Sequence, residues 1–150
     1  MPVISNSTVI RCSPEEVFDY LSDHRSELEW NPTCQAMEKI TAGPIGAGTR
    51  FRAKWKLSPV VELEILEYDR PRAWKVHNGG ALEVTFSCRL ERAQEGTRLR
   101  TDFDVRPHGP LRLIFPIMLR RLRAEEKANM SHIREALERR HLSTQHGAEQ

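Results

Sequence analysis

The hydrophobic period of the sequence changes along the chain. From Thr49 to Val105, apolar residues alternate with charged or hydroxyl-bearing ones, as in the segment FRAKW at 51–55. A period of two indicates strands with one buried and one solvated face, which is typical of an antiparallel sheet. After Gly109 the period is helical and stays so to about Arg140. The sequence therefore predicts an α+β fold in which antiparallel strands are followed by one long helix.

Two short helices are expected between the first strand and the rest of the sheet. Residues 3–12 have the composition of a strand, and the segment SPEE at 13–16 combines a capping serine with a proline at the first helical position. Asp23 can cap a second helix that ends near Glu29. Together with the later alternating segments, this gives a sheet of about seven strands.

Interruptions of the pattern mark turns and irregularities. Leu66 and Tyr68 are out of phase with the residues before them, which predicts a β-bulge. The segments NGG at 78–80 and EG at 95–96 predict tight turns. Pro116 either opens the C-terminal helix or kinks it. The stripe of this helix that is expected to face the sheet consists of Ile114, Met118, Leu122, Ile133 and Leu137.

Length and cysteine usage limit the class of protein. The 150 residues suit one domain, which we place at 1–141, and we expect the polar segment 142–150 to be a frayed tail. Cys12, Cys34 and Cys88 are odd in number and lack CxxC spacing, so we expect neither a disulfide nor a zinc site. The sequence has no N-terminal signal pattern and no apolar run of the roughly 18 residues that a membrane span needs. We therefore expect a cytoplasmic protein.

The charge balance argues against one class of partner. The formal net charge is only +2. A nucleic-acid-binding domain carries clustered basic surface, which supplies most of its affinity. We therefore expect no nucleic-acid partner.

No familiar catalytic or cofactor motif is visible. The glycine-rich segment 43–48 lacks the lysine and hydroxyl residue of a phosphate-binding loop, so we expect it to be a flexible hairpin loop or a border of a cavity mouth. The six histidines show no metal-ligand spacing, and His77 falls on the solvent phase of its strand. There is no nucleophile elbow, no Cys-His signature and no pair of carboxylates on a predicted buried face. We expect no metal and no cofactor, and we assign no catalytic residue.

Four segments taken together resemble a known family. They are SPEEVF at 13–18, WNP at 30–32, GPIGAGTRF at 43–51 and EYDRPR at 67–72. In order and spacing they resemble the helix-grip fold of the START-like (SRPBCC) superfamily, in its polyketide cyclase/dehydrase-like branch. The resemblance implies a curved sheet wrapped around the long helix, with a cavity between them for lipids, polyketides, hormones or quinones. It implies no particular reaction.

The strand alternation predicts which side chains would line this cavity. The inward phase is mostly aromatic and aliphatic, and Cys88 and Thr101 are its soft or polar members, for which ordinary core packing is the simpler interpretation. Residues of the helix would close the cavity from the other side. The full predicted set is Phe51, Trp55, Leu63, Trp74, Val76, Phe86, Cys88, Thr101, Phe103, Phe115, Met118 and Leu122.

Three functions follow from this set. The first hypothesis is a carrier or binding protein for a small apolar or aromatic ligand, because the inward phase offers walls and little chemistry. The second is a cyclase or aromatase whose cavity folds a reactive poly-carbonyl chain. The third is a protein-interaction module with a filled core. An ionisable group that points into the cavity would favour the enzyme.

The start of the C-terminal helix is more apolar than one buried stripe requires. Residues 111–119 contain six large apolar side chains besides Leu111, and Arg112, Arg120, Arg121 and Arg123 flank them. The surplus must be covered by something. A cavity lid, a homodimer contact or a transient contact with a membrane surface would each do so.

Overall fold

The computed structural model describes residues 3–148 of the chain. All seven strands in this part form one antiparallel sheet in the order β1-β7-β6-β5-β4-β3-β2. The expected α+β helix-grip fold is thereby confirmed. The elements are β1 (Val3–Ile10), α1 (Pro14–Ser22), η1 (His24–Ser26), α2 (Glu27–Trp30), β2 (Cys34–Lys39), β3 (Arg50–Trp55), β4 (Val61–Asp69), β5 (Ala73–Asn78), β6 (Leu82–Ala93), β7 (Gly96–Pro107) and α3 (Leu111–Ala148).

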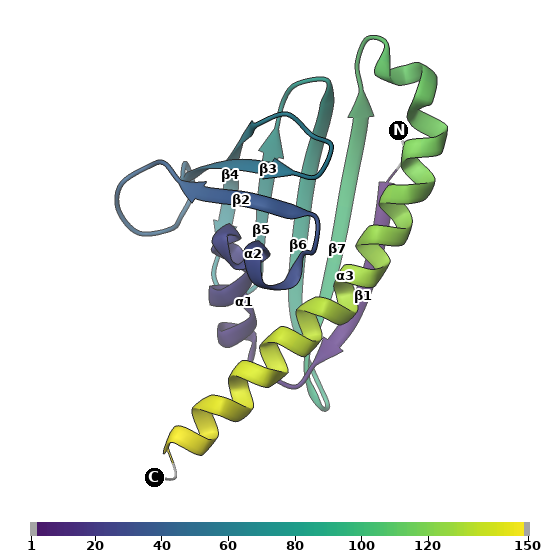
Figure 1. Cartoon of the computed structure of the whole chain (residues 1–150). Coiled ribbons are helices and arrows are strands. Elements are labelled where there is room, and N and C mark those ends of the chain that lie inside the picture. Colours follow the sequence, from purple (N-terminus) through teal and green to yellow (C-terminus); the bar gives the residue numbers. More distant parts are fainter. Residues whose placement is uncertain (1–2, 149–150) are drawn as a thin grey trace.

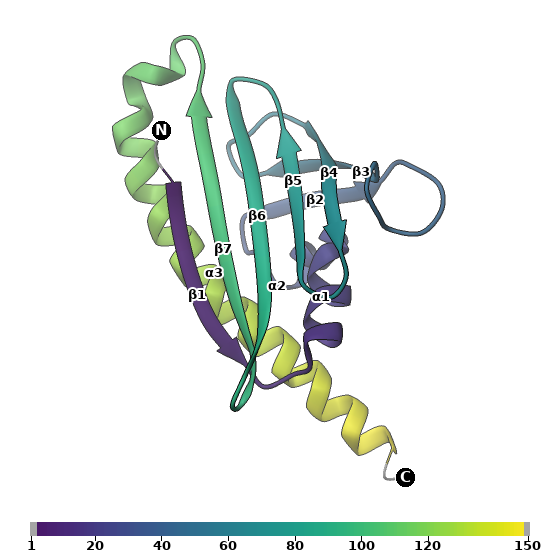
Figure 2. The same ribbon diagram turned by 180° about the vertical axis from the view of Figure 1, so that it is seen from behind.

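The sheet is strongly curled, and α3 lies on its concave side. Figure 1 shows α3 in front of β1 and β7, with β2 and β3 folded across the front of β5 and β6. The helices α1 and α2 fill the lower part of this concave side. Figure 2 shows the opposite, convex face of β7, β6 and β5, which α3 does not cover. The interior is consequently enclosed between α3, the short helices and the curled end of the sheet.

The structure contains the local features that the sequence predicted for α1 and β4. Ser13 caps α1, and its hydroxyl accepts a hydrogen bond from the backbone N–H of Glu16 at 3.2 Å. Pro14 is the first residue of this helix. The register between β4 and β5 shifts between Ile65 and Glu67, so the predicted bulge is confirmed.

The helix α3 is longer than the sequence suggested. It contains 38 residues and continues to Ala148, past the expected end near Arg140. At about 1.5 Å per residue it spans roughly 57 Å. Pro116 lies inside the helix, and the first turns of α3 run at an angle to the rest (Figure 1). The fraying of 142–150 stays a prediction, and 149–150 lie outside the described residues.

The buried apolar side chains form two separate cores. The large core packs the short helices and the C-terminal half of α3 against the sheet, and includes Leu99 and Ile133. The small core lies near the start of α3 and consists of Ile4, Val105 and Phe115 with partly buried neighbours. The middle of α3 lies between the two. None of the helices in residues 3–148 combines the length and the apolar character that crossing a bilayer requires.

Candidate ligand-binding site

Most of the predicted cavity residues belong to the large core. Five of them are buried there, and Trp55 and Phe86 are partly buried against it. These seven residues are Phe51, Trp55, Leu63, Trp74, Val76, Phe86 and Cys88.

The remaining predicted residues lie nearer the start of α3. Phe115 is buried in the small core, where Phe103 and Leu122 are its partly buried neighbours. Thr101 is buried on β7. Met118 is partly exposed and belongs to neither core. The structure thus divides the predicted set between the two cores, with Met118 in neither, and contact of these residues with a ligand stays a prediction.

The helical stripe differs from the expected one at its start. Ile114 is 52% exposed, because the stripe that faces the sheet passes through Phe115 instead. From there it follows the spacing of three or four residues through Leu119, Leu122, Glu126, Asn129, Ile133 and Leu137.

Aromatic side chains on the concave face retain solvent-accessible surface between the two cores. Trp55, Phe86 and Phe103 are only partly buried although they lie on the face that α3 covers. The rings of Phe86 and Phe103 are 4.7 Å apart between centroids and connect the large core with the small one. A side chain on a covered face stays accessible only where its neighbours leave room. We take the accessible surface of Trp55, Phe86 and Phe103, on the concave face of the sheet, as the candidate ligand site.

A polar cluster on the short helices contacts the aromatic wall of this site. Trp55 donates a hydrogen bond from Nε1 to Oε1 of Glu27 at 2.9 Å, and Asn31 donates to the same oxygen at 2.8 Å. Trp74 donates from Nε1 to Nε2 of His24 at 3.2 Å. The other ring nitrogen of His24, Nδ1, lies 3.7 Å from Oε2 of Glu27. The two tryptophans are therefore held in place by a buried carboxylate and a buried imidazole.

In this cluster, His24 and Glu27 have few lone pairs left to accept a proton from a ligand. Because Nε2 of His24 accepts the indole hydrogen of Trp74, the hydrogen of the neutral imidazole lies on Nδ1, toward Glu27. Glu27 already accepts two hydrogen bonds and is only 8% exposed. The groups of the cluster are thus arranged to position the tryptophans, and neither is placed as a free general base.

Glu126 supplies a second carboxyl group to the interior. It is partly buried on the stripe of α3 that faces the sheet. Burial first, and then the carboxylate of Glu27, raise the pKa of Glu126 to about 8, although a hydrogen bond from Asn129 opposes the rise. Glu126 is consequently a neutral acid at neutral pH, which can donate a hydrogen bond or a proton.

Two polar side chains on the sheet lack partners. Thr101 is 2% exposed, and neither its hydroxyl oxygen nor the side-chain nitrogen of Asn6 has a hydrogen-bond partner within residues 3–144. Asn6 and Thr101 are directly opposite each other in the β1–β7 pairing. Burial of an unpaired polar atom is unfavourable by about 1–3 kcal/mol. Such atoms are common where a ligand or an ordered water completes the site.

The sequence did not predict the polar groups of the interior. No pair of carboxylates was expected on a buried face. Glu27 and Glu126 are such a pair, and that prediction was wrong. Glu126 had a detectable signal, because it follows Leu122 by four residues and precedes Ile133 by seven, on the same helical stripe. The burial of His24 and Glu27 had none, because both lie in short helices without a clear period.

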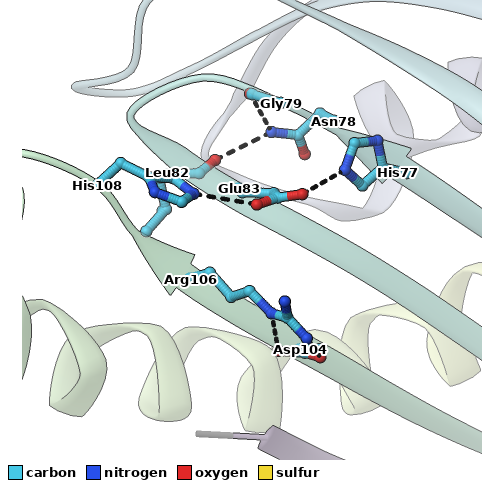
Figure 3. Close-up of polar contacts among 8 residues, drawn as sticks. All are labelled: His77, Asn78, Gly79, Leu82, Glu83, Asp104, Arg106 and His108. Carbon is cyan, nitrogen blue, oxygen red and sulfur yellow. Dashed lines mark hydrogen bonds and ion pairs between the residues drawn. The ribbon is translucent and has the colours of Figure 1, made fainter. Parts of the chain in front are cut away.

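A different histidine cluster lies on the outer face of the sheet. Figure 3 shows the Glu83 carboxylate between two imidazoles, with Nε2 of His77 at 2.8 Å and Nε2 of His108 at 3.0 Å. The hydrogen bonds from both histidines hold the pKa of Glu83 below its usual value. His77 thus lies away from the interior, as its phase in the strand predicted, and has a carboxylate partner.

A third cluster brings together residues from near both ends of the chain. The Cys12 thiol, the Glu16 carboxylate and Nδ1 of His141 place their potential ligand atoms within 4.8 Å of one another. No sequence signal indicated it, because Glu16 and His141 are 125 positions apart. Burial, with the nearby Glu16, raises the pKa of Cys12 to about 12, so the thiol is protonated and a metal ion would have to displace that proton. Nδ1 of His141 lies 3.1 Å from Oε2 of Glu16.

Two hollows lie on the surface of the described part of the chain. One, of about 260 Å³, separates α2 from α3 and is lined by residues such as Trp30, Asn31 and His132. The other lies at the β1–β7 pair, and its lining includes Asn6 and Thr101 besides Ser5 and Asp102. The glycine-rich loop between β2 and β3 projects away from α3 (Figure 1). Its predicted role at a cavity mouth stays a prediction.

Comparisons with known proteins agree with this architecture. A family model described as "Polyketide cyclase / dehydrase and lipid transport" matches residues 1–138. A search among curated proteins gave no match. Among solved structures, TTHA0849 from Thermus thermophilus has a TM-score of 0.75 at 17% identity, covering 91% of this chain and 97% of that one.

Two further solved structures show how widely the fold occurs. The Aha1 dimer from Colwellia psychrerythraea has a TM-score of 0.67 at 14% identity, with 92% of this chain and 97% of that one covered. Ara h 8.0201 has a TM-score of 0.60 at 16% identity, with 88% and 97% covered. At these identities the likeness shows the fold alone.

Proposed function

The chain belongs to the polyketide cyclase/dehydrase and lipid transport family, and we propose that it binds and carries a small apolar or aromatic molecule between its sheet and α3. The family supports binding of hydrophobic ligands in general. The observation that carries the proposal for this chain is the partial exposure of Trp55, Phe86 and Phe103 on the covered face of the sheet. An apolar ligand would remove this surface from water, which is worth about 25 cal/mol per Å² before the costs of association.

Binding should be visible through the tryptophans. Trp55 belongs to the candidate site, and the Trp74 ring lies 6.1 Å from the ring of Phe86, measured between centroids. An aromatic or polyene ligand should therefore quench or shift the tryptophan emission. It should also raise the melting temperature with increasing ligand concentration, because it binds the native state only.

The test is a panel of lipids, quinones and aromatic polyketides, with emission and melting temperature measured for each. Phe103→Ala should weaken binding, because it removes part of the wall at a partly buried position. Leu63→Arg, at a 5% exposed position, should abolish binding at a cost in stability. If no compound of the panel changes the emission or the melting temperature, the carrier function is refuted. The third hypothesis, a protein-interaction module with a filled core, would then be favoured.

Glu126 favours a second candidate function, a cyclase or aromatase that acts on a poly-carbonyl chain. A neutral acid in an apolar site can protonate or hydrogen-bond a carbonyl oxygen while a carbon–carbon bond forms, and such general acids contribute roughly a hundredfold or more to the rate. The aromatic walls would select which carbons meet. If purified protein changes the product pattern of a poly-carbonyl substrate, and Glu126→Gln abolishes this change, the enzyme replaces the carrier.

The predicted homodimer and membrane contacts stay predictions. The apolar patch at the start of α3 is open in the structure, with Leu113 86% and Ile117 75% exposed and with exposed arginines at 112, 120 and 121. Sedimentation with anionic vesicles would test the membrane contact, and measurement of the molecular mass in solution would test the homodimer.

A further inference from the structure

The stripe of α3 that faces the sheet is apolar at both ends and polar in the middle. Phe115 and Leu122 pack in the small core, and Ile133 and Leu137 pack in the large one. Between them the stripe carries Glu126 and the buried Asn129. A carboxyl group at a position suited to an aliphatic side chain destabilises the core unless it serves a partner.

No cation among the described residues balances this carboxyl group. Within residues 3–144, no ion pair joins Glu126 to a lysine, arginine or histidine. The charged groups that act on it are Glu27 of α2 and Glu125 of its own helix, and both are acidic. Burial and these neighbours raise the pKa of Glu126 to about 8. The Asn129 amide donates to the carboxyl group, which leaves the acid hydroxyl of Glu126 for another acceptor.

The unpartnered polar atoms of the sheet fall between the two cores in the order of residues along β7. On β7, Leu99 belongs to the large core and Phe103 packs against the small core. Thr101 lies between these two on the same face of the strand, with Asn6 opposite on β1. The order along β7 therefore places the free hydroxyl of Thr101 opposite the polar middle of α3.

From this juxtaposition we infer that the site selects neutral ligands bearing a hydrogen-bond-accepting oxygen, such as a ketone, which Glu126 and Thr101 hold, and rejects carboxylates. A ligand carbonyl oxygen can accept from both hydroxyl groups. A ligand carboxylate would instead enter an interior that already contains Glu27 and Glu126, where the His24 imidazole is the nearby basic group and no lysine or arginine within residues 3–144 forms an ion pair with either carboxyl group. This selectivity rests on the proposed binding function and specifies its ligand class.

Three probes with one aromatic skeleton test the inference. They are 2-acetylnaphthalene, a neutral ketone; 2-ethylnaphthalene, which has no oxygen; and 2-naphthoate, a carboxylate. Calorimetric titration at about pH 6 keeps naphthoate ionised and Glu126 neutral. We expect the ketone to bind roughly fivefold or more tightly than the hydrocarbon, as one or two neutral hydrogen bonds would give. Naphthoate should bind more weakly than either.

Substitutions at Glu126 and Thr101 test whether these two residues cause the preference for the ketone. Glu126→Leu should fold, because it restores the apolar stripe, and should bind ketone and hydrocarbon equally. Glu126→Gln keeps a donor and should retain the preference for the ketone. Thr101→Val, which is isosteric, should reduce this preference, whereas Glu135→Gln, at an exposed position of α3, should leave it unchanged.

The inference alone would be overturned if naphthoate bound as tightly as the ketone, or if the preference for the ketone survived in Glu126→Leu. If the hydrocarbon binds but the ketone has no advantage, the site is an unselective apolar one, and the carrier function stands without this inference. If none of the three probes binds, the inference fails, and the panel of lipids, quinones and aromatic polyketides decides whether the carrier function fails with it.

Discussion

The indole nitrogen of Trp55 donates a hydrogen bond to the buried Glu27 carboxylate at 2.9 Å. These residues are 28 positions apart, one at the end of β3 and the other at the start of α2. A side chain expected only to line the cavity therefore also satisfies a buried charge. The consequence is that binding and stability are coupled at this position.

Replacing Trp55 with Phe should destabilise the protein, although it trims volume without adding a polar group. Glu27 would keep Asn31 as a donor but lose the second hydrogen bond, which is worth roughly 1.5–3 kcal/mol for a charged acceptor. Urea unfolding should show this loss. Trp30→Phe is the control, because its indole reaches only the neutral Ser26 hydroxyl at 3.3 Å. Equal losses in the two variants would mean that the hydrogen bond to Glu27 contributes nothing.

A glycine at the start of β7 should be irreplaceable for steric reasons. Gly96 has a φ of +149°, and a Cβ atom there would lie 2.1 Å from the carbonyl oxygen of Ile10. Gly96→Ala should therefore cost about 2 kcal/mol or more and lower the melting temperature. Gly79→Ala should change stability by less than about 0.5 kcal/mol, because nothing lies within 4 Å of the added carbon. A Gly96→Ala protein as stable as Gly79→Ala would contradict the close approach of β7 to Ile10.

The outer cluster should make a small contribution to stability that depends on pH. The folded-state pKa of Glu83 is lowered by His77 and His108, so this carboxylate stabilises the fold above its ordinary pKa. That contribution is lost as the pH falls through the lowered value. The difference in melting temperature between wild type and Glu83→Gln should therefore shrink in strongly acidic solution. Glu62→Gln, on an exposed site of β4, controls for the change in charge. A difference that is constant with pH would show that the histidines do not act on Glu83.

The fold could be predicted because its signals are local and repeated. Alternation fixes which face of each strand is buried, so the inward positions of Phe51, Leu63 and Trp74 follow from the sequence alone. The capping serine and the bulge after Ile65 are equally local. Each depends on neighbours within a few residues.

The polar interior could not be predicted because it depends on contacts between distant segments. Nothing near His24 in the sequence shows that the Trp74 indole, 50 positions away, will reach its ring. The carboxyl group of Glu126 is close to Glu27 only because α3 packs beside the short helices. The stripe predicted for this helix contained only apolar residues, although Glu126 falls on the same periodicity.

Glu126 should make the stability of the protein fall as the pH rises toward 8. Its pKa is raised from 4.5 to about 8 on folding, so the folded state retains a proton that the unfolded state loses between these values. The stability of the fold relative to the unfolded chain is therefore greatest below 4.5 for this group and declines through the window from 4.5 to about 8.

The variant Glu126→Gln removes this dependence, because its amide does not titrate. It should match the wild type near pH 4.5 and exceed it by up to roughly 3 kcal/mol at pH 7, at about 1.4 kcal/mol per pH unit of the window. Urea unfolding at half-unit pH steps measures the difference. Glu135→Gln, at an exposed position of α3, should run parallel to the wild type at a constant offset of at most about 0.5 kcal/mol. If Glu126→Gln also runs parallel, the carboxyl group of Glu126 ionises freely, and it cannot be the neutral donor of the site.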